Sequence, residues 1–273
     1  MLRGLYGAAS GMVAQQQRQE MLANNLANAS TPGYKADQAS LRTFPKMLLQ
    51  AVNAQSMPVN RSYPIGELAT GVYLQERIPN FRQGDLMESG NTTDVALLQG
   101  ILPENEDGRE MALFYTVEHD NEELRYTRNG NFTVDGEGFL TTAQGRYILS
   151  TDGERMAVGS ENFTVAANGI VTNEAGVQVG QINVVLAEDP LQLVKEGDGL
   201  LRFTEDGELP SVVANEEIAY QIQQGFIERS NVDAGQTMTE MMATYRSFEA
   251  NQRVLQAYDQ SLEKAVNEVG RIG

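Results

Sequence analysis

The sequence predicts an α+β protein, with a predominantly β central domain inserted between long N- and C-terminal helices. Three observations support this class. Apolar residues recur at helical spacing at both ends of the chain, prolines gather after the first helical pattern, and Asn-Gly and Asp-Gly pairs recur through the middle. The predicted divisions are residues 1–35, 36–80, 81–229 and 230–273.

The first helix is expected over about residues 2–28. Six of eight positions at alternating three- and four-residue spacing are apolar: Leu2, Leu5, Ala9, Met12, Gln16, Gln19, Ala23 and Leu26. Asn24, Asn25 and Asn28 lie near its end, although Asn is a mediocre helix former because its amide competes for backbone groups. They are interpreted as caps, as a polar strip for packing against copies of the same helix, or as a label that another protein reads.

Residues 36–80 are expected to form an extended, proline-containing linker. Five of the eight prolines lie between residues 29 and 80. Proline lacks a backbone donor and cannot sit inside a helix without cost.

The β domain is expected over residues 81–229, where short β-rich runs alternate with turn pairs such as Asn129-Gly130 and Asp152-Gly153. Residues 131–140 and 162–171 both begin Asn-Phe-Thr-Val and carry a glycine at the same offset. Each is predicted to be a hairpin of two strands and a tight turn.

The second long helix is expected over about residues 237–269. Eight of ten positions on its predicted seam are apolar: Met238, Met241, Tyr245, Phe248, Gln252, Leu255, Asp259, Leu262, Val266 and Val269. Gln252 and Asp259 interrupt the seam, as polar residues that set the register of a coiled coil do. The alternative is an ordinary long helix packed on its own domain.

The charge of the chain is unevenly distributed. The net charge is −17, and residues 61–229 carry 11 Lys and Arg against 29 Asp and Glu. This sign argues against binding to a phosphate backbone, so no nucleic-acid partner is expected. The two ends are close to neutral, so the terminal helices of several copies can pack together without strong repulsion. We therefore predict that they form a coiled-coil-like layer on assembly.

No enzymatic site is expected. The chain has no Cys, and its one His, His119, lies beside Asp120 without a nucleophile signature. The acidic run Glu104 to Gly108 lacks the ligand spacing of a calcium loop. Paired carboxylates for glycoside hydrolysis are available in any acidic β protein, but the chain has no Trp for stacking on sugars. We expect no catalytic, cofactor-binding or metal-binding residue, and no cofactor.

No segment of the sequence approaches the roughly 18 apolar residues of a membrane span. The first residues also lack the apolar stretch of a cleaved secretory signal. The expectation is a chain that stays in the cytoplasm or is exported by a route without a cleaved signal.

Both ends of the chain resemble the bacterial flagellar rod and hook family. "ANNLANASTPGYK" (Ala23 to Lys35) is similar to its N-terminal signature, and "ERSNVDAGQTMTEMMATYRSFEANQRVLQAYDQSLEKAVNEVG" (Glu228 to Gly270) to its C-terminal one. "ESGNTTD" (Glu88 to Asp94) and "YTRNGNFTVDGEGFL" (Tyr126 to Leu140) resemble the middle of the rod subfamily. Within the family the chain is most similar to the hook-basal-body rod proteins of Gram-positive bacteria.

The resemblance implies a non-enzymatic subunit of the basal-body rod, required for motility. Its partners would be copies of itself, other rod and hook subunits, and the flagellar type III apparatus that exports it unfolded and uncleaved to the extracytoplasmic basal body. The implied assembly interface comprises Leu5, Met12, Asn24, Asn25, Leu26, Asn28, Pro32, Gly33, Tyr34, Met241, Tyr245, Phe248, Asn251, Leu255, Leu262 and Val266. "FPKML", with Phe44 and Leu48, resembles the short signal that such subunits present to the export gate.

The chain departs from the family between Asp94 and Tyr115. Rod subunits commonly carry a Gly-Asp-Gly-Phe-Phe stretch here, and this chain is expected to substitute a charged loop that alters the edge of the β domain. This difference motivates an alternative function, that of an exported cap, scaffold or assembly factor of the flagellum. A glycan hydrolase is a third hypothesis.

Overall fold

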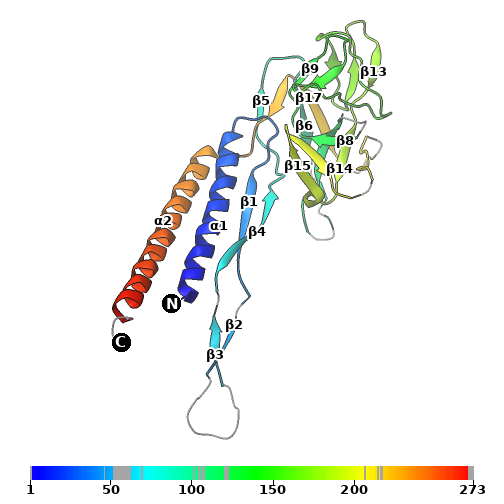
Figure 1. Cartoon of the computed structure of the whole chain (residues 1–273). Coiled ribbons are helices and arrows are strands. Elements are labelled where there is room, and N and C mark those ends of the chain that lie inside the picture. Colours follow the sequence, from blue (N-terminus) through cyan, green and yellow to red (C-terminus); the bar gives the residue numbers. More distant parts are fainter. Residues whose placement is uncertain are drawn as a thin grey trace. The chain divides into compact units, whose positions relative to one another are not determined.

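The computed structural model describes residues 2–45, 47–51, 63–68, 70–100, 102–103, 105, 108–119, 123–205, 207–213, 215 and 218–269 (Figure 1). The chain divides into two compact units. Unit 1 comprises Met1–Leu26, Asp37–Ile78 and Ala234–Gly273, and unit 2 comprises Ala27–Ala36 and Pro79–Asp233. The fold is therefore α+β, with an N-terminal helix, a mostly β middle and a C-terminal helix, as predicted.

Unit 1 contains both long helices and a narrow β ribbon. Its elements are α1 (Leu2–Ala27), β1 (Asp37–Thr43), β2 (Met47–Ala51), β3 (Tyr63–Leu68), β4 (Val72–Pro79), α2 (Ala234–Lys264) and a terminal π-helical turn (Ala265–Val269). Strand β1 pairs with β4, and β2 pairs with β3. The expected linker 36–80 thus supplies four strands, and its residues 52–62 lie outside the described part.

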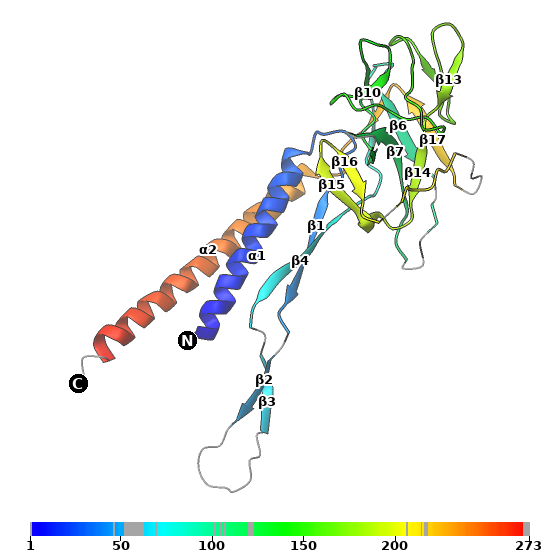
Figure 2. The ribbon, with the colours of Figure 1, turned by 45° about the vertical axis from the view of Figure 1, so that its right-hand side comes forward.

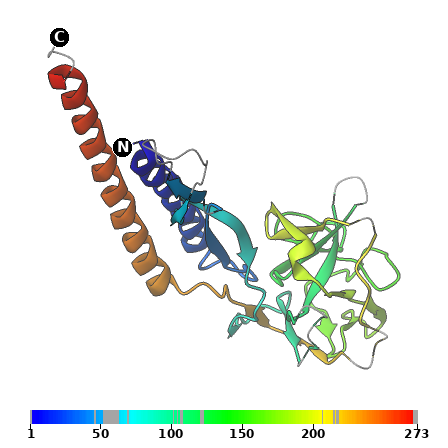
Figure 3. The same cartoon turned by 90° about the horizontal axis from the view of Figure 1, so that it is seen from below.

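Within unit 1, helix α1 lies between α2 and the β1–β4 ribbon, as Figures 1, 2 and 3 agree. Arg18 of α1 forms an ion pair with Glu240 of α2 at 3.2 Å. On the ribbon side, the Ser10 hydroxyl accepts a hydrogen bond from the backbone N–H of Val72 at 3.3 Å. Helix α1 therefore contacts one partner on each of two faces.

The two helices are antiparallel and approach closely at glycines of α1. Gly4 faces the ring of Tyr258, whose hydroxyl would overlap any Cβ at that position. One heptad later, a Cβ at Gly11 would lie 3.0 Å from the side-chain nitrogen of Asn251. Glycine lacks a Cβ, so a large side chain of α2 fits against the α1 backbone at these two positions.

Unit 2 is a β unit whose buried apolar side chains form two clusters. Its strands are β5 (Leu86–Glu88), β6 (Val95–Gln99), β7 (Ala112–Glu118), β8 (Leu124–Thr127), β9 (Phe132–Val134), β10 (Leu140–Thr142), β11 (Thr164–Val165), β12 (Ile170–Thr172), β13 (Gln178–Gln181), β14 (Val184–Ala187), β15 (Leu193–Gly197), β16 (Leu200–Phe203), β17 (Tyr220–Gln224) and β18 (Phe226–Glu228), with a short 3-10 helix over Pro190–Gln192. The largest sheet has the antiparallel order β14-β7-β8-β16-β15. Strand β17 pairs with β6, and β18 with β5.

The two predicted hairpins are confirmed. Strands β9 and β10 pair antiparallel with Leu140 opposite Val134, and β11 and β12 pair with Val165 opposite Val171. Gly138 and Gly169, which share an offset in the two repeats, both have φ of +87°. This left-handed conformation favours glycine, which explains why the repeats share it.

The interval Asp94 to Tyr115 is not the charged edge loop that was expected. Its first part forms β6 and its last part forms the start of β7, which lies inside the five-stranded sheet. Leu97 and Leu113 are buried in the core. Apart from Asp94, the charged residues of this interval lie in the connection between β6 and β7, whose residues 101, 104, 106 and 107 are outside the described part. The prediction was wrong because β6 and β7 are short apolar runs on either side of an acidic connection.

Candidate functional site

The exposed side of α2 carries half of the predicted seam. Within the chain, Met241, Phe248, Leu255 and Leu262 are half-buried, whereas Met238, Tyr245, Gln252, Asp259 and Val266 are exposed. The residue preceding each of these five is buried or half-buried instead: Thr237, Thr244, Asn251, Tyr258 and Ala265. The side of α2 that is covered within the chain therefore differs from the predicted seam. At every second seam position, the covered residue is the one before the predicted residue.

This offset leaves large apolar side chains of α2 and of the π-helical turn that follows it exposed to solvent. Met238 is 51% exposed, Tyr245 49% and Val266 71%. Large apolar residues that line up on one side of a helix usually mark an interaction surface. Single exposed apolar residues need no explanation, but these recur at heptad spacing.

The predicted interface residues of α1 are only partly covered. Leu5, Met12 and Leu26 are half-buried. The fully buried apolar side chains of this helix are Ala8, Ala14, Met21 and Leu22, while Tyr6 and Val13 are 65% and 54% exposed. Helix α1 therefore also presents apolar side chains to solvent.

The three asparagines of the N-terminal signature have different surroundings. Asn25 is buried, and its side-chain amide both donates to the backbone oxygen of Asp37 at 2.8 Å and accepts from the N–H of Asp37 at 2.9 Å. The Asn28 side-chain oxygen accepts from the Thr31 hydroxyl at 3.2 Å, and Asn24 is exposed. Asn25 thus holds the start of β1 against the end of α1 within one chain.

The turn after α1 is fixed inside unit 2. Pro32 and Gly33 are half-buried, and Gly33 has a φ of +68°. The N–H of Gly33 donates to the backbone oxygen of Glu228 at 2.8 Å. The ring of Tyr34 lies 4.4 Å below the ammonium of Lys195, which also donates to the backbone oxygen of Lys35 at 2.7 Å.

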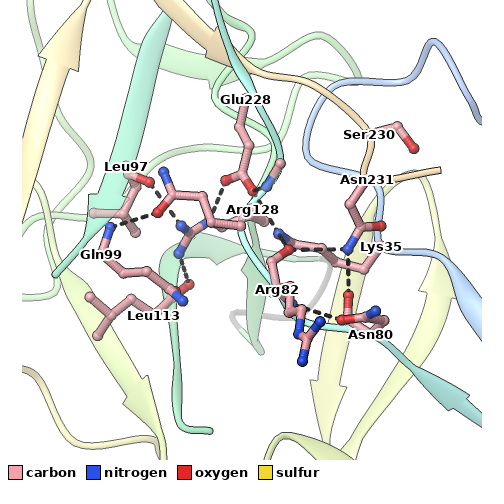
Figure 4. Close-up of polar contacts among 12 residues, drawn as sticks. Lys35, Asn80, Arg82, Leu97, Gln99, Leu113, Arg128, Glu228, Ser230 and Asn231 are labelled. Carbon is pink, nitrogen blue, oxygen red and sulfur yellow. Dashed lines mark hydrogen bonds and ion pairs between the residues drawn. The ribbon is translucent and has the colours of Figure 1, made fainter. Parts of the chain in front are cut away.

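A group of charged and polar side chains lies next to this turn, and we call Lys35, Arg128, Glu228 and Asn231 the junction cluster (Figure 4). The three charged side chains are buried, and Asn231 is half-buried. The Glu228 carboxylate accepts from the Lys35 ammonium at 2.6 Å and from Nε of Arg128 at 2.6 Å. It also accepts from the N–H of Gly84 at 2.8 Å. The side chain of Glu228 is 1% exposed, that of Lys35 5% and that of Arg128 2%.

The remaining donors of the two cations are satisfied by backbone oxygens. Arg128 donates to Leu97 at 2.8 Å and to Leu113 at 2.6 Å, which lie on β6 and β7. The Lys35 ammonium donates to Arg82 at 2.7 Å. Buried charges are tolerated when they are paired and hydrogen-bonded in this way.

Burial and charge act in opposite directions on the pKa values of the cluster. Burial lowers the pKa of Lys35 to about 8, although the Glu228 carboxylate counteracts this. Burial alone would raise the pKa of Glu228, but the Arg128 and Lys35 cations outweigh it and hold this pKa below its usual 4.5. Glu228 is therefore ionised at neutral pH despite its burial.

This lowered pKa predicts an acid-sensitive contribution to stability. A carboxyl whose pKa is lower in the folded chain stabilises it fully above the unfolded pKa of 4.5, and this contribution is lost as the pH falls through the folded value. Glu228→Gln should have a lower free energy of unfolding at pH 7 and a weaker pH dependence below about pH 4.5. Urea denaturation at several pH values measures both.

Glu137→Gln is the matched control because Glu137 is exposed in the β9–β10 turn. Its pH dependence should parallel that of the natural chain. If the free energy of unfolding of Glu228→Gln falls as steeply at low pH as that of the natural chain, the cluster does not contribute to acid unfolding.

Asn231 joins the same segments through backbone atoms. Its side-chain oxygen accepts from the N–H of Ala36 at 2.8 Å, and its side-chain nitrogen donates to the backbone oxygens of Asn80 at 2.8 Å and Arg82 at 3.1 Å. One amide therefore connects the segment that follows α1, the segment that follows β4 and the segment that precedes α2.

The two residues of the expected export signal lie on the ribbon of unit 1. Phe44 is 40% exposed and packs against the ring of Tyr73, with 5.1 Å between the centroids. Leu48 lies on β2, paired with Glu67 of β3. Lys46, between them, lies outside the described residues.

The other candidates concern metal ligands, membrane spans and His119. The described residues contain no cluster of three or more His, Asp or Glu side chains that could hold a metal ion. Among the helices described, none is long and apolar enough to cross a membrane. The backbone N–H of His119 donates to the oxygen of Glu123, and Asp120 lies outside the described residues.

Sequence reasoning did not single out Arg128, Glu228 or Asn231 as a joined group. Glu228 and Asn231 stood at the start of the C-terminal signature, and Lys35 at the end of the N-terminal one. Charged side chains are rarely fully buried, so nothing in the sequence separates these from solvated ones.

Comparisons with known proteins agree with the positions of the signatures. Residues 5–35 match the family "Flagella basal body rod protein", residues 112–173 match "Flagellar hook protein FlgE/F/G D1 domain", and residues 223–268 match "Flagellar basal body rod FlgEFG protein C-terminal". The first match ends at Lys35 and the third contains Glu228.

Relatives match along the whole chain. The flagellar hook-basal body complex protein FlhO of Bacillus subtilis is 47% identical over 273 residues, which cover 100% of both chains. The flagellar basal-body rod protein FlgG of Borreliella burgdorferi is 30% identical with 98% of each chain covered. The rod protein FlgF of Caulobacter vibrioides is 30% identical with 100% of each covered.

These relatives are structural components of the flagellum rather than enzymes, and the long helices and the junction cluster lie in the segments that match them. The chain belongs to the flagellar basal-body rod protein family.

Proposed function

We propose that the chain is a structural subunit of the rod that polymerises helically, with copies of itself and with other rod and hook subunits, through its terminal helices. The observation that carries this proposal is that large apolar side chains are exposed on one side of α2 and of the π-helical turn after it, on a line that also contains Gln252 and Asp259, although α2 already packs against α1. Met238, Tyr245 and Val266 are exposed at heptad spacing. A second copy that packs on this side would bury them in a coiled-coil-like layer.

The charge distribution supports packing through the helices rather than through the β units. Residues 61–229 carry most of the negative charge, whereas the terminal residues are close to neutral. Like charges repel, so close contact between β units of different copies is less favourable than contact between helices.

We further propose that the chain reaches the extracytoplasmic basal body unfolded, through the flagellar type III apparatus and without a cleaved signal, and that motility requires it. Phe44 and Leu48 are the proposed export-gate residues. Replacing Phe44 by Ala should lower the amount of chain outside the cytoplasm, as measured by immunoblotting of cell fractions, while an unchanged amount would remove Phe44 from this role.

The test of assembly replaces an exposed residue of the proposed seam. Tyr245→Glu leaves the isolated chain intact because Tyr245 contacts solvent there, but it places an unpaired charge in the assembled layer at a cost of several kcal/mol. Quantitative mass spectrometry of washed basal bodies should then detect little or none of the variant, and swimming should stop. Leu255→Asp should also block assembly, but Leu255 is half-buried, so this change disturbs the helix pair of the free chain as well.

Gln260→Glu is the matched control, since Gln260 is exposed on α2 outside the seam and gains the same charge. It should be incorporated normally. Normal incorporation of Tyr245→Glu would exclude this side of α2 as an interface. Absence of the natural chain from basal bodies, combined with loss of swimming when it is deleted, would instead favour an assembly factor.

A further inference from the structure

The junction cluster connects three parts of unit 2 that are distant in the sequence (Figure 4). Lys35 belongs to the segment that follows α1, Arg128 directly follows β8, and Glu228 ends β18 shortly before α2. The contacts of Glu228 with Lys35 and with Arg128 span 193 and 100 residues respectively. One carboxylate therefore joins the N-terminal junction, the core and the C-terminal junction.

The two cations depend on this carboxylate for their charge balance. Apart from Glu228, the acceptors that the structure gives them are the neutral backbone oxygens of Arg82, Leu97 and Leu113. Removing one partner of a buried ion pair costs far more than the pair contributes, because the other charge stays buried without compensation. Lys35 and Arg128 are hence stably buried only when Glu228 is in place.

The backbones of the two junction segments are also joined directly. The N–H of Gly33 donates to the oxygen of Glu228 at 2.8 Å, and the N–H of Ala36 donates to the Asn231 side chain at 2.8 Å. Residues 33–36 and 228–231 thus share hydrogen bonds as well as charges. Each segment needs the other to satisfy its buried polar groups.

We propose that Glu228 is a completion latch, a residue that fixes the segment after α1 only once the segment before α2 has folded onto it. Synthesis delivers the N-terminus first, so residues 27–36 cannot complete their contacts with Glu228 and Asn231 until residues 228–231 are available. The latch then fixes, in one step, the two segments of unit 2 that connect to the long helices. This role belongs to the isolated chain and does not depend on the proposed place in the rod.

The test is hydrogen exchange, measured by mass spectrometry, on the full chain with Glu228→Gln and with Lys35→Met. Glu228→Gln should raise exchange of residues 33–36 and 228–231 together, by roughly 100-fold or more, while β7 and β8 keep their protection. Lys35→Met keeps the ion pair between Arg128 and Glu228, so it should raise the hydrogen exchange of both segments by a smaller factor. In the double variant the increase in exchange should be smaller than the product of the increases in the two single variants, because Glu228 and Lys35 interact.

Glu196→Gln is the matched control. Glu196 also bridges two arginines, Arg125 at 2.6 Å and Arg202 at 2.6 Å, but it is 31% exposed. Ion pairs that are partly open to solvent contribute less than fully buried ones, so exchange at the two junction segments should change less than about fivefold.

If Glu228→Gln raises hydrogen exchange only at residues 228–231 and residues 33–36 stay protected, the proposed latch is wrong. It is also wrong if the increases in exchange of the two single variants multiply in the double variant. If Glu228→Gln does not fold, Lys35→Met and Asn231→Ala decide the question. Asn231→Ala removes the acceptor of the Ala36 N–H and should again raise exchange in both segments together.

Discussion

Ending the chain after Gln224 is expected to unfold unit 2, whereas ending it after Asp233 is expected to leave unit 2 folded. The shorter chain lacks β18, so β5 loses its partner strand and the cations of Lys35 and Arg128 lose Glu228. Breaking a buried ion pair costs about 3–5 kcal/mol, a large part of the roughly 5–15 kcal/mol that stabilises a typical domain. The longer chain keeps all of unit 2 and lacks only α2 and the residues after it.

Near-ultraviolet circular dichroism and thermal unfolding of the two truncated chains measure this difference. A cooperative transition in the longer chain and none in the shorter one are expected. Cooperative unfolding of both would show that β18 and the junction cluster are dispensable. Loss of the transition in both would show that unit 2 needs the C-terminal helix.

Gly33→Ala is expected to destabilise the chain much more than Gly90→Ala. Both glycines have positive φ, +68° at Gly33 and +75° at Gly90, so both substitutions carry the penalty of about 1–2 kcal/mol for a left-handed residue. A Cβ at Gly33 would also lie 2.5 Å from the carbonyl carbon of Arg128, whereas a Cβ at Gly90 meets nothing within 4 Å. With overpacking of about 1–3 kcal/mol added, the total at Gly33 is about 2–5 kcal/mol.

Urea denaturation of the two variants gives the two free energies directly, and their difference isolates the close approach of the Gly33 turn to the Arg128 backbone. Equal losses would mean that the turn moves away without cost. Equal losses would therefore show that the close packing of the Gly33 turn on the Arg128 backbone does not hold the segment after α1 in place.

The two long helices could be predicted because their signals are local. Apolar residues at three- and four-residue spacing give α1 and α2, and the observed ends of α1 differ little from the predicted 2–28. The hairpins at 131–140 and 162–171 were predictable for the same reason, since turn glycines and β-rich runs act over a few residues.

The inner side of α2 was harder to predict. Periodicity favours the most apolar line of side chains, which runs through Tyr245 and Val266. In the chain itself, α1 offers glycines at Gly4 and Gly11, and these accept Tyr258 and Asn251. Shape complementarity of two particular helices thus selects the neighbouring line, and the more apolar one stays exposed.

By itself, the sequence determined the fold class, the two helices, the hairpins and, through its terminal signatures, the family. Tertiary structure alone decided that Lys35, Arg128 and Glu228 meet in one buried cluster. The physical reason is range: helices and turns follow from residues a few positions apart, whereas a contact across 193 residues depends on how the whole of unit 2 closes. A charged side chain looks the same in the sequence whether it is solvated or, like Glu228, holds two ends of a domain together.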